Sequence, residues 1–192
     1  MPRIREIKIL YEEKEVYDPE VGEPVRTLEA VLRLTSFLRC AADEAVWALV
    51  LDAERKLIGL YQLGKGGRTE APVDLAALYR TVLLCEGSAV ILVHNHPACG
   101  VSPSSADIQT TEQILLAGLA LRVPLLDHVI LSAGSAYSFG QAGMLRFLEA
   151  KQLKALGMRG VPEPGNPEAR AVLTTVARKE PPCATTPATA AA

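Results

Sequence analysis

The chain has 192 residues, of which 49% are apolar and 22% charged, and its formal net charge at pH 7 is −2. This composition is ordinary for a globular protein with one core, and the near-neutral charge gives no global basic field that would attract nucleic acid or an anionic membrane. The apolar runs are shorter than the roughly 20 residues of a membrane span. The first residues also lack the apolar stretch of a secretion signal, so we expect a cytoplasmic protein.

Hydrophobic periodicity divides the chain into three regions. Residues 1–26 predict an N-terminal extension, with a strand of alternating character over 3–17 and a turn after it. Residues 27–156 predict one domain. Residues 157–192 are rich in Pro, Ala and Thr, and we expect most of this extension to be disordered because it can bury too little apolar surface to offset the loss of chain entropy.

Helices and strands alternate within the predicted domain. The helices, inferred from apolar residues at helical spacing and from capping residues, are expected over 27–40, 72–85, 103–122 and 141–156. The strands, inferred from short apolar runs, are expected over 44–52, 57–63, 89–94, 125–131 and 136–139. The first two strands predict a hairpin followed by a glycine-rich loop over 64–67, and Thr27 and Ser102 are the expected N-caps of the first and third helices.

The sequence His94-Asn95-His96, followed by Ser104 and Asp107, places several metal-binding residue types close together. Residues two apart on a strand point to the same face, so the two imidazoles can converge on one ion where the strand 89–94 ends. Asp107 lies about one turn inside the next helix, from which its carboxylate can reach back as a third ligand. Such a set leaves the fourth tetrahedral position of zinc open for water, which is typical of hydrolytic zinc rather than structural zinc.

Hydrolysis also needs a group that accepts a proton and a group that stabilises the oxyanion. Glu44 is the candidate general acid/base, although its place at the start of a strand is equally typical of a solvated strand end. The Ser104 hydroxyl could donate to the oxyanion that forms on an attacked carbonyl. The other interpretations stay open for single residues: two histidines at a strand end are more often structural, and an aspartate in a first helical turn stabilises the helix dipole.

The combined spacing His94-x-His96, seven residues, Ser104, two residues and Asp107 matches the signature of the JAMM (JAB/MPN+) metalloproteases at every position. The surrounding segments resemble the bacterial RadC branch of that family, namely HNHPACG, VSPSSADIQTT, LLDHVI, YSF and the Glu-bearing strand EAVWALVLD. The resemblance covers about residues 27–140. It implies an α/β fold with a mixed central sheet flanked by helices, the JAB/MPN (cytidine-deaminase-like) domain.

The resemblance also implies roles for the site residues. It assigns Zn²⁺ binding to His94, His96 and Asp107, general acid/base catalysis to Glu44 and oxyanion support to Ser104. The implied activity is that of a zinc metallopeptidase-like hydrolase acting on a peptide or an isopeptide-linked protein. Two alternatives stay open: a DNA-associated, RadC-like repair or nuclease-related protein, which the net charge does not support, and an inactive metal-bearing interaction domain.

Two further patterns bear on these hypotheses. The RadC branch tends to carry Pro-Arg-Glu before its second helix, whereas this chain has Pro72-Val73-Asp74, and the missing arginine puts any shared substrate contact in doubt. Asp127 and His128 look like a catalytic pair, but neighbouring residues on a strand face opposite sides of the sheet. We expect instead a hydrogen-bonded pair that holds the loop near the site.

Overall fold

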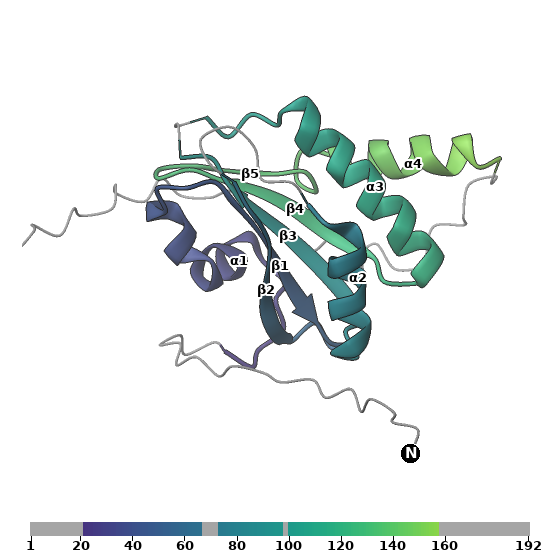
Figure 1. Ribbon diagram of the computed structural model, residues 1–192, viewed down its shortest axis with the longest axis horizontal. Coiled ribbons are helices and arrows are strands. Elements are labelled where there is room, and N and C mark those ends of the chain that lie inside the picture. The colour runs from purple at the N-terminus through teal and green to yellow at the C-terminus, as the bar shows by residue number, and fades with distance from the viewer. Residues whose placement is uncertain (1–20, 67–72, 98–99, 158–192) are drawn as a thin grey trace, which may run out of the picture.

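A five-stranded mixed sheet forms the centre of the computed structural model, which describes residues 21–66, 73–97 and 100–157 (Figure 1). The strand order is β2-β1-β3-β4-β5. β3 and β4 are parallel, and the other neighbouring pairs are antiparallel. The strands are β1 (Ala45–Leu51), β2 (Leu57–Lys65), β3 (Ala89–Asn95), β4 (Leu125–Leu131) and β5 (Ala136–Ser138). This architecture confirms the predicted α/β class.

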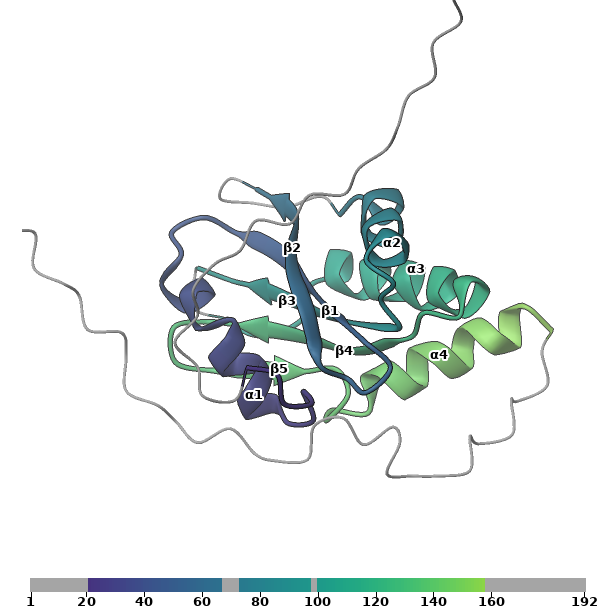
Figure 2. The ribbon, with the colours of Figure 1, turned by 90° about the horizontal axis from the view of Figure 1, so that it is seen from below.

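Helices cover both faces of the sheet, as Figure 2 shows, with α1 on one face and α2 and α3 on the other. Alternate residues of the three inner strands, β1, β3 and β4, therefore face different helices and are almost all buried, as in a doubly covered sheet. In β3, Ile91 and Val93 pack in the cluster that includes α1, whereas Val90 and Leu92 pack in the cluster that includes α2 and α3. The helices are α1 (Leu28–Leu34), a 3-10 helix (Ser36–Cys40), α2 (Leu75–Leu84), α3 (Ser105–Leu121) and α4 (Met144–Ala155).

The connection from β3 to β4 determines where the candidate site lies. Parallel neighbours need a crossover, and α3 provides it between these two strands. The N-terminus of α3 consequently follows closely after the end of β3. In open α/β sheets, binding sites often lie at such carboxyl ends of parallel strands.

Several element boundaries differ from the predicted ones. The N-cap of α3 is Ser104 rather than Ser102, because only that register lets Asp107 occupy the third helical position and return a hydrogen bond. α2 begins at Leu75, since the Asp74 side chain accepts from the Ala77 N–H and caps it. β2 continues to Lys65 through the first half of the predicted loop.

Some sequence-based predictions lie outside the described residues, namely the strand over 3–17 and almost all of the C-terminal extension. Thr27 caps α1 as predicted, accepting a hydrogen bond from the Ala30 N–H. Across the described ranges, no helix combines the length and apolar character needed to span a membrane.

Candidate metal centre

The end of β3 presents His94 toward α3. His94 continues the even-numbered series of Val90 and Leu92, which packs in the cluster with α2 and α3, so the strand pleat alone sets this direction. Its Nδ1 atom lies 2.7 Å from Oδ1 of Asp107, and both side chains are buried. His96 lies two residues further on, and its ring centroid is 4.6 Å from that of His94. The structure therefore brings the two predicted imidazoles and the predicted aspartate together.

Asp107 is oriented by the cap of its own helix. Its Oδ2 atom accepts hydrogen bonds from the Ser104 backbone N–H at 2.8 Å and from the Ser104 hydroxyl at 2.6 Å. Its backbone N–H donates in return to Ser104 Oγ. Burial alone would raise the pKa of Asp107, but the hydrogen bonds from His94 and Ser104 outweigh burial and hold that pKa well below its usual range. Asp107 is therefore a buried carboxylate that stays ionised.

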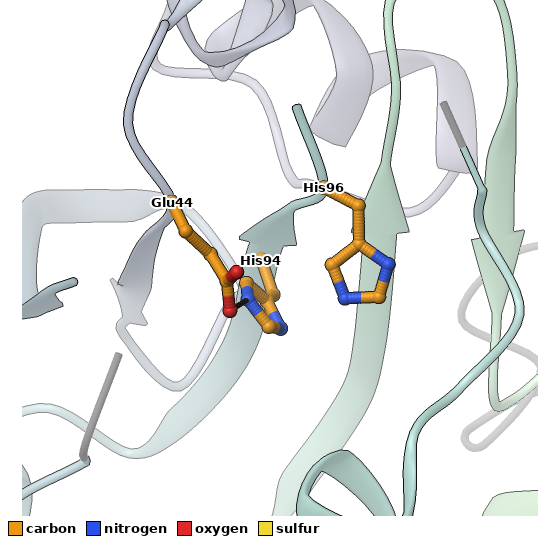
Figure 3. A group of neighbouring side chains, drawn as sticks. All are labelled: Glu44, His94 and His96. Carbon is orange, nitrogen blue, oxygen red and sulfur yellow. Dashed lines mark hydrogen bonds and ion pairs between the residues drawn. The ribbon is translucent and has the colours of Figure 1, made fainter. Parts of the chain in front are cut away.

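Glu44 reaches His94 from a different strand. It directly precedes β1, whose first residue, Ala45, pairs with Asn95 at the end of β3. This register places the Glu44 carboxylate against the ring, with Oε1 2.8 Å from Nε2 of His94 (Figure 3). Its side chain is 15% exposed, so the carboxylate lies at the rim of the site rather than in bulk solvent.

Asn95 holds the segment that carries Glu44, a role that the sequence analysis did not assign. Because it directly follows His94 on β3, its side chain points to the opposite face. It accepts from the Ala45 N–H at 2.9 Å and donates to the Asp43 carbonyl at 3.0 Å, so it bonds both neighbours of Glu44. The sequence shows an amide side chain between two histidines, but the backbone groups that it bonds lie about 50 residues earlier in the chain, so its role could not be predicted.

His96 is held in one tautomer. Its Nδ1–H donates to the Gly100 carbonyl at 2.9 Å, which leaves the Nε2 lone pair available in the neutral ring. That Nε2 atom lies 3.6 Å from Oδ2 of Asp107. A lone pair facing a carboxylate is unfavourable unless a cation lies between them, and a histidine held through its other nitrogen is typical of metal ligands.

His94 lies between two carboxylates. A neutral imidazole has one N–H and can donate to only one of them, so donation to both Asp107 and Glu44 requires the imidazolium. Burial opposes that charged form, but the hydrogen bonds and charges of Asp107 and Glu44 outweigh burial and raise the pKa of His94 above its ordinary value of 6.5. A metal cation can replace the proton on either nitrogen, so the same arrangement that favours protonation also favours metal binding.

The donor set fits a divalent transition metal. Imidazole nitrogens combined with carboxylate oxygens are typical ligands of zinc and its first-row neighbours. Among the described residues, two triads have ligand atoms that all lie within 4.8 Å of one another, and they share His94. One triad adds Glu44 and His96, as Figure 3 shows, and the other adds Asp107 and His128.

The structure gives Asp127 and His128 separate partners. The direct link between them is the His128 backbone N–H, which donates to Asp127 Oδ1. The Asp127 carboxylate also accepts from the Ser138 hydroxyl and the Gly140 N–H, so it ties β4 to β5 and to the segment that follows. Burial outweighs these hydrogen bonds and raises the pKa of Asp127 to about 6. Burial likewise lowers the pKa of His128 to about 3, so His128 is neutral at pH 7.

Comparison with known proteins identifies the family. A family model described as a RadC-like JAB domain matches residues 25–144. A UPF0758 protein of Porphyromonas gingivalis is 35% identical over 113 residues, which cover 58% of this chain and 50% of the relative. One of Stenotrophomonas maltophilia is 40% identical over 108 residues (56% and 46%), and one of Alteromonas mediterranea is 33% identical over 141 residues (73% and 60%).

The chain spans about half the length of most of these curated relatives. Their names state no activity. The matched region contains Glu44, His94, His96, Ser104 and Asp107, and it extends over more than half of the chain. The chain therefore belongs to the family of RadC-like JAB domains.

Proposed function

We propose that the chain is a zinc-dependent hydrolase that cleaves peptide or isopeptide bonds in protein substrates. One observation carries this proposal: Asp107 contacts both His94 and His96, while Glu44 contacts His94 from the rim. In this proposal His94, His96 and Asp107 hold the metal. A bound zinc ion would polarise the scissile carbonyl and lower the pKa of water toward neutrality.

Glu44 is the residue we assign to proton transfer. Its carboxylate is partly exposed and lies beside the metal-binding imidazoles, so it can accept a proton from the attacking water and deliver that proton to the leaving amine. Among the described residues, the other carboxylate in contact with His94 is Asp107, whose pKa is too low for this task. The two carboxylates therefore suit different roles.

The oxyanion role of Ser104 stays a prediction. In the structure the Ser104 hydroxyl donates to Asp107 Oδ2, and donation to a substrate oxygen would require the hydroxyl to exchange that acceptor. The Ser104 backbone N–H would continue to hold the Asp107 carboxylate during such an exchange. A Ser104→Ala variant would thus test both the cap and the predicted oxyanion contact.

Metal analysis combined with a substrate panel tests the proposal. The purified full chain is analysed for zinc and then offered isopeptide-linked and linear peptide substrates, with duplex and single-stranded DNA alongside. We compare wild type with Glu44→Gln and with Asp43→Asn. Asp43 is a matched control because it is an adjacent acid whose exposed side chain pairs with Lys65.

We expect one zinc ion per chain, peptide or isopeptide cleavage by wild type and Asp43→Asn, and loss of cleavage with zinc retained in Glu44→Gln. Absence of zinc would overturn the proposal. Zinc binding without cleavage of any substrate would favour the inactive interaction domain. DNA cleavage or binding that weakens steeply with salt would favour the DNA-associated alternative.

A further inference from the structure

His128 is a buried imidazole that the proposed reaction does not use. It is the third histidine of a chain that has three, and it is 1% exposed. It lies on β4, where it pairs with Leu92, and His94 pairs with Ile130 further along the same two strands. The rings of His96 and His128 both lie near that of His94, with centroid distances of 4.6 and 6.4 Å, so all three histidines of the chain gather near the end of β3.

Thr111 determines which nitrogen of His128 carries the proton. The Thr111 hydroxyl donates its proton to the Asp107 carbonyl at 2.6 Å, so it can only accept in its 2.8 Å contact with Nδ1 of His128. The neutral His128 ring must then carry its proton on Nδ1 and a lone pair on Nε2. That Nε2 atom is buried and has no hydrogen-bond partner among the described residues. A buried acceptor without a partner is uncommon in native structures and suggests an unassigned ligand.

The side chains around His128 indicate the chemical class of that ligand. A ring nitrogen of His128 lies within 4.8 Å of a His94 ring nitrogen and an Asp107 carboxylate oxygen, and all three residues are buried. The His94 and His128 rings are nearly parallel, with centroids 6.4 Å apart. Phe139 stacks on His128 with centroids 4.7 Å apart and fixes the plane of the ring. Two imidazoles and one carboxylate attract a divalent first-row transition metal rather than an anion or an apolar group.

We propose that His128 is a further metal ligand, which forms with His94 and Asp107 an inner binding position for zinc or a similar divalent cation. The inference rests on the proposed function because it shares His94 and Asp107 with the proposed catalytic set. The two nitrogens of His94 face different ways: Nδ1 toward Asp107 and Nε2 toward Glu44. The inner position is enclosed by buried side chains, which is typical of a site that holds metal rather than one that binds substrate.

The experiment uses the full chain loaded with Co²⁺, which reports its ligands by spectroscopy. Proton NMR of the cobalt protein counts the exchangeable imidazole N–H signals that the metal shifts, and chelator competition measures zinc affinity. His128→Asn is the main variant, since its amide can still donate to Thr111 while Nε2 is lost. His96→Asn is the comparison variant: it removes a ligand of the proposed catalytic set that does not belong to the inner triad, so it separates the two positions. The melting temperature without metal checks that each variant folds.

We expect shifted N–H signals from His94, His96 and His128 in wild type. In His96→Asn the His94 and His128 signals should persist, and His128→Asn should lose at least tenfold in zinc affinity. The inference is overturned if no shifted signal arises from His128 or if His128→Asn binds zinc within twofold of wild type. If His128→Asn does not fold, the assignment of signals in the wild-type cobalt protein decides alone. If all three imidazoles bind the metal but no substrate is hydrolysed, the proposed function is overturned and this inference stands. If the protein hydrolyses a substrate but gives no shifted His128 signal, this inference is overturned and the proposed function stands.

Discussion

Replacing Asn95 by alanine tests how the fold positions Glu44. Asn95 is 2% exposed, and its side chain bonds the Ala45 N–H and the Asp43 carbonyl. The alanine variant leaves the N–H of Ala45 without its acceptor among buried atoms, and an unsatisfied buried donor costs about 1–3 kcal/mol. Asp43 is an exposed residue, so water can replace the bond to its carbonyl. We therefore expect a loss of about 2 kcal/mol in the free energy of unfolding.

Urea denaturation measures this loss, with the midpoint lowered and the slope unchanged. A loss of that size corresponds to a melting temperature lowered by roughly 4–8 °C for a domain of this length. Nitrogen NMR of the imidazoles gives a second readout, since a displaced Glu44 would remove the partner of His94 Nε2. Gln113→Ala, on the exposed side of α3, serves as the control and should stay within about 0.5 kcal/mol of wild type. An Asn95→Ala protein as stable as this control, with unchanged His94 signals, would refute the role that we assign to Asn95.

Three further predictions follow from the charges of the site and of β4. Glu44→Gln should lower the hydrolysis rate at least about 100-fold while zinc content stays unchanged; a variant that loses its zinc would show that Glu44 is a ligand instead. Because the pKa of His94 is raised above 6.5, protons compete with the metal for its ring nitrogens. Chelator titrations should therefore give up to about tenfold tighter zinc binding per pH unit as the pH rises from 6 to 8. A zinc affinity that does not change with pH would contradict this prediction. Because the pKa of Asp127 is raised from 3.8 to about 6, this residue contributes stability that is fully present below pH 3.8 and is lost as the pH rises through about 6. Asp127→Asn, which can still accept from the backbone N–H groups, should flatten that part of the stability profile in urea titrations, and an unchanged profile would exclude Asp127 as its source.

Local sequence pattern was sufficient for the strands, most helices and the two histidines. The pleat of a strand has a period of two, so the spacing of His94 and His96 already predicts which side they share. Helical periodicity likewise places Asp107 in the first turn of α3, although the cap was assigned two residues too early. That error arose because Ser102 and Ser104 are equally good caps by residue type, and only the reciprocal hydrogen bonds between Ser104 and Asp107 distinguish them.

The contacts between distant segments required the tertiary structure. Glu44 meets His94 because β1 pairs with β3 in one particular register, and a shift of one residue would turn the side chains of β1 to the other face. His128 joins the same place because the α3 crossover makes β4 the parallel neighbour of β3. Short-range periodicity determines which residues of one element share a face, whereas strand register and crossover determine which elements meet. The sequence therefore identified residues of metal-binding types, and the tertiary structure decided which carboxylates and imidazoles lie together.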